Sequence, residues 1–256
     1  MDVWQEATNN WSDLCVAMGC RRVRASGALV HTYPINRSGS FYNSVFVQNA
    51  RSFAIEQVER AYAEQKLPFA IVLPRLKDYE ELANSLEQLE YSLAPPWMLM
   101  TLRELSGDSN PEVSVEAIDR SKLEDWFELQ DAFPHAESSK PTRLEMIRKV
   151  SMNNSTRLLL ASIQGRPVGA GLLFMKDHVA SIHMIATLFS FRRRHVATTV
   201  TLDAIRRSKK MELVWLRTRR GGTGEKVYTK IGFEVFADIL AYTKTPQDED
   251  SNLPPK

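Results

Sequence analysis

Cysteine is scarce in this sequence of 256 residues, and its two copies, Cys15 and Cys20, lie close together in the first segment. Two such cysteines, with no second pair elsewhere, form neither a disulfide framework nor a zinc site. We therefore expect two reduced, partly buried thiols. Long apolar runs of the roughly 18 residues that span a membrane are also missing. The first residues, MDVWQEATNN, lack the basic and apolar regions of a signal peptide. These absences favour a cytoplasmic protein with no membrane partner.

An excess of charge of one sign is missing too. Lysine and arginine number 33 and aspartate and glutamate 31, which gives a formal net charge of +2. Proteins that bind nucleic acid usually carry a clearly basic domain, so this balance argues against a nucleic-acid partner. The 43% hydrophobic and 25% charged composition is typical of a globular protein with a sizeable core. The length favours two domains over one long domain.

One break divides the chain. Residues 106–111, SGDSNP, are turn-forming or polar, and they separate the apolar stretch WMLMTL from VSVEAI, which is typical of a strand. The last ten residues, QDEDSNLPPK, show no apolar periodicity. The predicted organisation is a first domain at 1–105, a linker at 106–111, a second domain at 112–245 and a disordered tail at 246–256.

The second half alternates predicted strands and helices. Ser121 is predicted to cap a helix through DWFELQDAF, with Glu124 as its capping-box partner. Further helices are predicted at 141–152, after FRRRH (191–195) and in EKVYTKIG (225–232). Strands are predicted at 113–118, 157–163, 168–175, 178–187, 213–218 and 233–243.

The first half gives weaker patterns. They predict helices at 58–65 and 78–89 and strands at 68–74 and 97–102. The spacing from Leu86 to Tyr91 in this half equals the spacing from Tyr228 to Phe233 in the second half. Each time the first residue lies in a short predicted helix that follows a strand, and the aromatic residue comes just after that helix. Two related domains in tandem explain this similarity, and so do two unrelated strand–helix–strand units, which are common.

The largest local concentration of charge is in FRRRHVATTV (191–200), between a predicted strand and an amphipathic helix. Successive backbone N–H groups at a helix N-terminus and arginine guanidinium groups both bind phosphate well. The position therefore favours a pyrophosphate site over a nucleic-acid patch or a solvated helix face.

The order of a strand at 182–187, an arginine-rich turn into a helix, a second strand and a short helix ending in Tyr-x-x-x-Gly-Phe resembles the GNAT superfamily of N-acetyltransferases, over about residues 112–245. The resemblance implies an α/β (α+β) fold: a mixed, mostly antiparallel sheet flanked by helices. The first half is then a second, degenerate domain of the same kind. The resemblance also implies acetyl-CoA as cosubstrate, an amine as acceptor and no metal.

The resemblance assigns the acetyl-CoA site to backbone and loop residues. The family loop Arg/Gln-x-x-Gly-x-Gly/Ala corresponds to Arg192–Ala197, where His195 occupies the usual glycine position. This departure predicts an altered loop or weaker binding, unless the imidazole is itself a phosphate ligand. The implied binding residues are Ile185, Ala186, Thr187, Arg192, Arg193, Arg194, His195, Val196, Ala197 and Thr198.

Two side chains are the implied catalytic residues. Tyr228 corresponds to the family's general acid, and a tyrosine is neutral at pH 7 and can donate its proton. The asparagine that often precedes it by seven residues is Gly221 here. Strand alternation places Ser181, His183, Ile185 and Thr187 on one face. Through the arylalkylamine branch of the family, His183 becomes a possible base. The alternatives are a tyrosine packed by its ring and a histidine bonded to backbone.

Three functions remain open. The first is an N-acetyltransferase acting on a small amine, an amino acid, or a protein N-terminus or lysine. The second is a non-catalytic acyl-CoA-binding or scaffold protein, suggested by His195 and Gly221. The third is a transferase that uses aminoacyl-tRNA, suggested by the scattered basic clusters. Residues 31–46 are predicted to form a turn-rich hairpin or to line the acceptor cleft. No motif identifies the acceptor or an oligomeric state.

Overall fold

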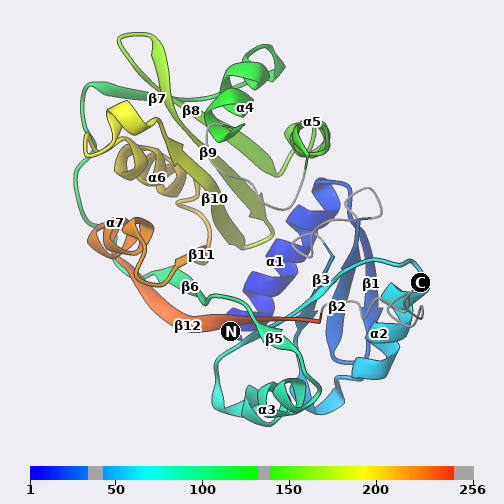
Figure 1. Cartoon of the computed structure of the whole chain (residues 1–256). Coiled ribbons are helices and arrows are strands. Elements are labelled where there is room, and N and C mark those ends of the chain that lie inside the picture. Colours follow the sequence, from blue (N-terminus) through cyan, green and yellow to red (C-terminus); the bar gives the residue numbers. More distant parts are fainter. Residues whose placement is uncertain (34–42, 132–138, 245–256) are drawn as a thin grey trace, which may run out of the picture.

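The computed structural model describes residues 1–33, 43–131 and 139–244 (Figure 1). The α-helices are α1 (Val3–Ala17), α2 (Ile55–Ala63), α3 (Glu80–Gln88), α4 (Leu123–Asp131), α5 (Lys140–Ser151), α6 (Val196–Arg207) and α7 (Thr223–Ile231). Short 3-10 turns are η1 (Ala50–Ser52), η2 (Lys77–Tyr79), η3 (Arg120–Lys122) and η4 (Phe189–Phe191). The strands are β1 (Arg21–Ala25), β2 (Ala28–Thr32), β3 (Ser44–Val47), β4 (Ala70–Pro74), β5 (Ser92–Leu93), β6 (Trp97–Leu102), β7 (Val113–Ala117), β8 (Thr156–Ile163), β9 (Arg166–Lys176), β10 (Val179–Thr187), β11 (Leu213–Arg219) and β12 (Phe233–Thr243).

All helices and strands predicted for the second half are present. Those predicted for the first half are present too, but the prediction missed other elements there. The sequence patterns did not indicate α1, β1 or β2. The predicted cap at Ser121 is wrong, because the Asp119 side chain accepts a bond from Ser121 N (2.8 Å) and starts η3 ahead of α4. The predicted hairpin at 31–46 lies partly outside the described residues, and the predicted tail at 246–256 lies wholly outside them.

The strands form one sheet in the order β1-β2-β3-β4-β12-β6-β11-β10-β9-β8-β7, with β5 paired to β12. Its neighbours are antiparallel except for two pairs, β3–β4 and β10–β11. This confirms the expected α/β fold with a mostly antiparallel sheet flanked by helices. None of the described helices is long and apolar enough to cross a membrane.

The two halves of the sheet repeat one topology. In the first half β1, β2 and β3 are antiparallel, α2 crosses to the parallel strand β4, and α3 follows. In the second half β8, β9 and β10 are antiparallel, α6 crosses to the parallel strand β11, and α7 follows. Helix α3, with Leu86, therefore corresponds in order to α7, with Tyr228.

The last strand of each half is exchanged. Strand β6 follows α3 in the chain but pairs with β11, and β12 follows α7 but pairs with β4. The exchanged strands also pair with each other at the centre of the sheet. Figure 1 shows β12 running from α7 toward β3 and β2 of the first half. Each half thus completes its sheet with a strand from the other.

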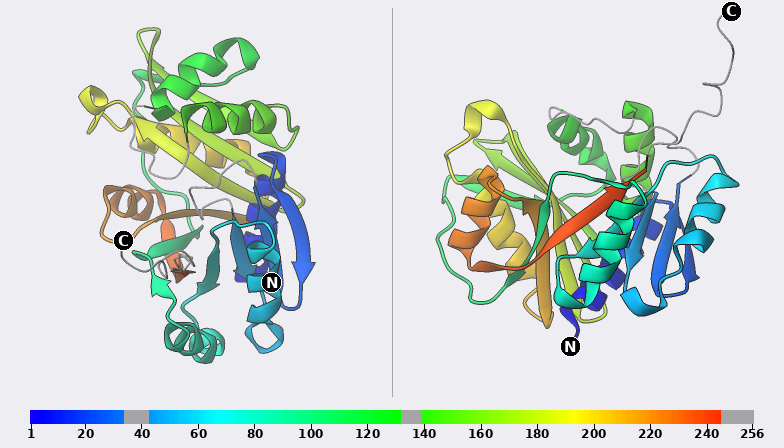
Figure 2. Two further views of the ribbon diagram at one scale, coloured as in Figure 1. Left: turned by 45° about the vertical axis from the view of Figure 1, so that its right-hand side comes forward. Right: turned by 60° about the horizontal axis from the view of Figure 1, so that its bottom comes forward.

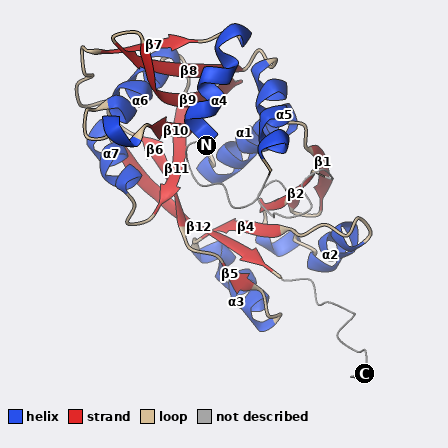
Figure 3. Cartoon of the chain, turned by 45° about the horizontal axis from the view of Figure 1, so that its top comes forward, coloured by secondary structure: helices blue, strands red, loops and turns tan. Residues whose placement is uncertain are grey.

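Helices cover both faces of the second half (Figures 2 and 3). Residues of α6 and α7, such as Val200 and Ile231, belong to one apolar core. Residues of α1, α4 and α5, such as Trp11, Trp126 and Met146, belong to the other core, which also includes the first half. The buried face of α1 is therefore shared by the two halves.

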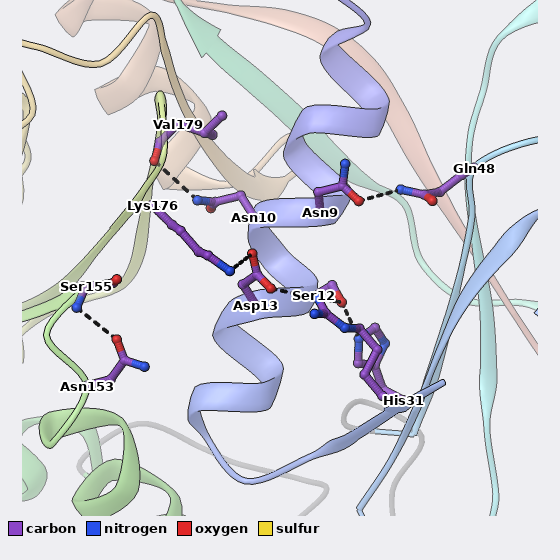
Figure 4. Close-up of polar contacts among 11 residues, drawn as sticks. Asn9, Asn10, Ser12, Asp13, His31, Gln48, Asn153, Ser155, Lys176 and Val179 are labelled. Carbon is purple, nitrogen blue, oxygen red and sulfur yellow. Dashed lines mark hydrogen bonds and ion pairs between the residues drawn. The ribbon is translucent and has the colours of Figure 1, made fainter. Parts of the chain in front are cut away.

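Helix α1 also makes polar contacts to both halves (Figure 4). The Asp13 carboxylate lies 2.7 Å from the Arg22 guanidinium of β1 and 2.8 Å from the Lys176 ammonium of β9. The Asn10 amide donates to Val179 O of β10 at 3.3 Å. Gly19, two residues after the end of α1, has φ of 104°, and the next residue donates from Cys20 N to Cys15 O. Both cysteines are buried and form no disulfide with each other.

Gly232, which ends α7, has φ of 107°, and a Cβ there would overlap the Glu104 carbonyl oxygen. We expect Gly232→Ala to lower the free energy of unfolding by about 3 kcal/mol or more, because it adds a steric overlap to an unfavourable φ. Denaturant unfolding followed by tryptophan fluorescence measures this loss.

Gly165→Ala is the matched control. Its φ is 76° and a Cβ there would meet nothing within 4 Å, so only the backbone cost of about 1–2 kcal/mol applies. Equal losses in the two variants would contradict the close approach of Glu104 to Gly232.

Candidate active site

Strands β10 and β11 separate partway along their length. They pair in parallel from Val179–Leu213 to Ile182–Leu216, and the pairing ends there although both strands continue. On its other side β10 stays paired with β9 through Thr187. The backbone groups of residues 185–187 that face β11 are thus available to an added extended chain. The predicted role of residues 185–187 as a binding edge requires backbone groups that no neighbouring strand occupies.

A bulge occurs in β10 at the point of separation. Met184 has φ of 54°, and the register with β9 shifts between His183 and Ala186. As a result, Met184 packs against the core below α1, and Ile185 packs against the α6 core. The predicted alternation, with Ile185 on the His183 face, is therefore wrong. An extra residue in one strand of a pair reverses the faces beyond it.

Gln130 of α4 holds the bulge. Its side-chain amide donates to Met184 O at 2.6 Å, and Gln130 is buried. The sequence analysis did not single out this residue. A glutamine within an amphipathic helix carries no signal that it will reach the backbone of a distant strand.

Two glycines let α6 approach the sheet closely. A Cβ on Gly169 of β9 would lie 2.5 Å from Val196 Cγ1, and one on Gly171 would lie 2.8 Å from Val200 Cγ1 and 2.7 Å from Ile185 Cδ1. Larger residues at either position would push α6 away from β9 and β10. The N-terminus of α6 is therefore fixed beside the free edge of β10.

The predicted phosphate loop joins β10 to α6 through η4. The backbone φ angle is −64° at Arg192, 63° at Arg193 and 59° at His195. Arg192 is extended, with ψ of 156°, and the positive φ angles at Arg193 and His195 turn the chain into α6. His195 is the N-cap residue of α6, and no side chain caps the helix. The first N–H groups of α6, at Val196, Ala197 and Thr198, have no partner from a capping side chain.

His195 has a left-handed backbone conformation, which favours glycine, the residue that the sequence resemblance led us to expect there. Glycine adopts a positive φ without steric cost, and histidine is one of the residues that tolerate it best among the others. The imidazole is exposed rather than turned into the core. His195 therefore preserves the backbone geometry that glycine usually supplies.

The arginines of the loop have local contacts. The Arg192 guanidinium lies 5.0 Å from the centre of the Phe189 ring, and that of Arg194 lies 3.1 Å from Glu112 Oε2. Asn110 supports the loop, because its amide donates to Arg194 O and its backbone N–H to Thr199 Oγ1. Part of the predicted linker at 106–111 is thus anchored against the start of α6.

Tyr228 projects from α7, next to the end of β11. Its ring meets the Phe233 ring edge-on, at 6.1 Å between centres, and it packs against the α6 core. Gly224 leaves room for it, since a Cβ there would lie 3.2 Å from Tyr228 Cε2. Burial raises the pKa of Tyr228 to about 12, and its hydroxyl bonds to none of the described residues. The side chain is therefore a neutral phenol with a proton to donate.

His183 lies on the opposite face of β10 from α6, and only 8% of its surface is exposed. Its ring meets that of Trp215 edge-on at 5.4 Å. Burial, helped by the nearby positive charge of Arg217, lowers the pKa of His183 to about 3. Arg217 itself lies between the Trp11 and Trp97 rings, 4.1 and 5.1 Å from their centres. His183 is therefore neutral at pH 7 and a weak base.

The structure thus gathers the predicted backbone and loop residues at one end of α6 and places Tyr228 on the neighbouring helix. His183 belongs to the other face of the sheet, beside aromatic residues that the sequence did not connect with it. Among residues 1–33, 43–131 and 139–244 there is no group of three or more histidine, cysteine or acidic side chains suited to a metal ion.

Comparisons with known proteins agree with this arrangement. Residues 121–233 match the acetyltransferase (GNAT) family. The comparison with curated proteins gave no match.

Solved structures share the fold over most of the chain. A GCN5-related N-acetyltransferase from Kribbella flavida has a TM-score of 0.73 at 15% identity and covers 96% of this chain and 97% of its own. A functionally unknown conserved protein from Staphylococcus epidermidis ATCC 12228 has a TM-score of 0.66 at 15% identity, over 89% of this chain and 94% of its own. A GCN5-related N-acetyltransferase from Sphaerobacter thermophilus has a TM-score of 0.62 at 14% identity, over 85% and 76%. At these identities the likeness concerns the fold, and it includes the first half.

The lowered pKa of His183 predicts a pH dependence of stability. Between pH 6.5 and about 3 the unfolded chain binds more protons at this residue than the folded chain does, so the free energy of unfolding falls as the pH falls. The contribution approaches about 1.4 kcal/mol per pH unit. Urea unfolding of His183→Gln across this range should show a shallower slope than the wild type.

Thr156→Val is the control for that comparison. It changes a buried hydroxyl on β8, two strands away from His183, without removing a titratable group, so it should keep the wild-type slope. Equal slopes in His183→Gln and the wild type would mean that His183 does not resist protonation.

Proposed function

Because residues 121–233 form a domain of the acetyltransferase (GNAT) family, we propose that this protein transfers the acetyl group of acetyl-CoA to a primary amine. The chain carries an acyltransferase domain, and the proposal concerns its cosubstrate, its residues and its chemistry. One observation carries it. The pairing of β10 with β11 ends at Ile182–Leu216, which leaves residues 185–187 without a strand partner on that side, a few residues before the N-terminus of α6.

The pyrophosphate would bind at the start of α6. The N–H groups of Val196, Ala197 and Thr198 and the positive end of the helix dipole favour an anion there. Arg192, Arg193 and Arg194 are exposed around this point and supply charge-assisted hydrogen bonds. His195, at the N-cap, adds a further donor when its imidazole turns toward the phosphates.

The pantetheine arm would extend along β10. Ala186 and Thr187 stay paired with β9 on one side, Ile185 lies in the bulge just before them, and none of the three has a strand partner on the β11 side. An extended chain with amide groups, such as pantetheine, pairs with such an edge as an added strand does. The bulge at Met184 ends this edge, so the thioester would lie beside it.

Tyr228 would act as the general acid. As the amine nitrogen bonds to the thioester carbonyl carbon, the carbon–sulfur bond breaks and the sulfur leaves as a thiolate. The Tyr228 hydroxyl has no competing partner among the described residues, and its raised pKa keeps it protonated until the thiolate accepts the proton. Backbone N–H groups at the bulge would stabilise the negative charge on the carbonyl oxygen.

His183 has a narrower role in this proposal than a strong base would have. A histidine with a pKa near 3 holds a proton poorly, so it does not store the proton of the amine. It can accept a hydrogen bond from the amine and so orient the lone pair of the amine nitrogen toward the thioester. Water would then be the final acceptor of the amine proton. His183 therefore stays a candidate catalytic residue, acting as a neutral imidazole.

The first half would be a degenerate domain of the same kind. It repeats the strand and helix order of the second half, but buried Leu86 stands where α7 carries Tyr228. Leucine has no proton to donate, so this half would carry no chemistry of its own. Through β6 and α1 it would instead shape the acceptor side of the site, where Trp97 and Trp11 flank Arg217.

Acetyl-CoA binding tests the first step. Titration calorimetry should show binding to the wild type, and Arg192→Ala should weaken it about tenfold by removing a charge-assisted bond to phosphate. Arg207→Ala is the matched control, because Arg207 lies at the far end of α6 and pairs with Asp203. His195→Gly tightens binding if the imidazole crowds the phosphates and weakens it if the imidazole is a ligand. Absence of binding to the wild type at millimolar acetyl-CoA would overturn the proposal.

Catalysis is tested separately from binding. Tyr228→Phe should lower kcat about 100-fold, since general acid catalysis contributes on this scale, and leave the Kd for acetyl-CoA within about twofold. Thiol release with a panel of primary amines measures kcat. Tyr242→Phe is the control, because that hydroxyl bonds to Glu87 in the first half. Binding of acetyl-CoA without thiol release for any amine would instead favour a non-catalytic acyl-CoA-binding protein.

A further inference from the structure

Several polar atoms are buried without a partner on the α1 side of β10 and β11. They are Ser181 Oγ, His183 Nε2, Trp215 Nε1 and Asn10 Oδ1, and none of them bonds to any part of the chain that the structure describes. All four residues are at least nine-tenths buried. Buried polar groups in folded proteins nearly always have a hydrogen-bond partner, either protein or ordered water. A group of four therefore requires an explanation.

The four residues are neighbours. Ser181 and Trp215 are directly paired across β10 and β11, and the His183 ring meets the Trp215 ring edge-on at 5.4 Å. The Asn10 amide donates to Val179 O, two residues before Ser181 on the same strand. Trp11, the next residue of α1, lies 6.1 Å from Trp215 between ring centres. Helix α1 closes this group from solvent.

We propose that these residues form a binding site for an internal water molecule, which positions His183. The hydrogen-bond capacities match those of water. Trp215 Nε1–H only donates and Asn10 Oδ1 only accepts, so a water between them accepts one bond and donates another. The remaining lone pair and proton of the water suit His183 and Ser181, because the Ser181 hydroxyl can donate or accept a hydrogen bond. Buried waters typically make about three such bonds.

The Ser181 hydroxyl decides which tautomer His183 adopts. Nε2 is the enclosed nitrogen, so Nδ1 is the nitrogen left for a bound amine. When Ser181 accepts the second water proton, the water can only accept from His183, and Nε2 then carries the ring proton. The hydrogen bond at one ring nitrogen fixes the state of the other. Nδ1 then presents a lone pair, a consequence that rests on the proposed acetyltransferase function.

The water itself is tested without any ligand. In the ¹⁵N-labelled full chain, NOE and ROE spectra with selective water excitation should show a cross-peak of the bound-water sign at the Trp215 indole N–H. The Trp126 indole is the control in the same spectrum, because it is buried and donates to Gly171 O at 3.0 Å. Trp215→Phe and Trp126→Phe assign the two signals. Absence of a water cross-peak at Trp215 would overturn the proposal.

Variants of the partners sharpen this test. Ser181→Ala should weaken the water cross-peak at Trp215 at least twofold, because the water loses one of its bonds. Thr156→Val is the matched control, since Thr156 also has a buried hydroxyl without a partner but lies on β8. Equal weakening by both variants would contradict a local water site.

The ¹⁵N shifts of the His183 ring test the positioning role. The signals, identified by their loss in His183→Gln, should show the proton on Nε2 in the wild type, and Ser181→Ala should raise the population with the proton on Nδ1. A wild-type ring protonated on Nδ1 would overturn the positioning role but would not contradict the water site. Neither measurement uses acetyl-CoA, so failure of the proposed function would be seen separately, in calorimetry.

Discussion

The separation of β10 from β11 is the constraint on which the candidate site depends. A strand released from one neighbour must be held firmly by its other contacts, and here β9, α6 and Gln130 hold it. Gly169 and Gly171 bring α6 against the strand, and the bulge at Met184 ends the regular edge. The backbone of a few residues thus faces outward without a partner while the sheet around it remains continuous.

The same sheet makes the two halves interdependent. The exchange of β6 and β12 joins them by backbone hydrogen bonds at the centre of the sheet, and α1 joins them through a shared apolar core. Asp13, paired with Arg22 of one half and Lys176 of the other, adds a polar connection. The side chains around His183 come from α1, β10 and β11, so the first half contributes directly to the surroundings of a candidate catalytic residue.

The sequence predicted what depends on local pattern. The elements of the second half followed from periodicity, and the arginine turn and the Tyr-x-x-x-Gly-Phe helix from their spacing. Contacts between distant segments left no such pattern. The reach of Gln130 to Met184 and the burial of His183 beside Trp215 and Trp11 depend on how α4 and α1 pack. The bulge that turns Ile185 to the α6 face is one extra residue in a strand, which alternation cannot reveal. Helix α1 was missed because its polar residues face the contacts between the halves, as Asn10 and Ser12 do.

The exchanged strand has a consequence for biosynthesis. A ribosome releases the chain from its N-terminus, and the central partner of β4 is β12, at the opposite end of the described chain. The first half therefore emerges with one edge of β4 unpaired, and its sheet closes only after β12 has been synthesised. Unpaired strand edges promote association between nascent chains. A stop codon just before β12 would leave both halves open, with β3 as the single neighbour of β4 and β11 as the single neighbour of β6.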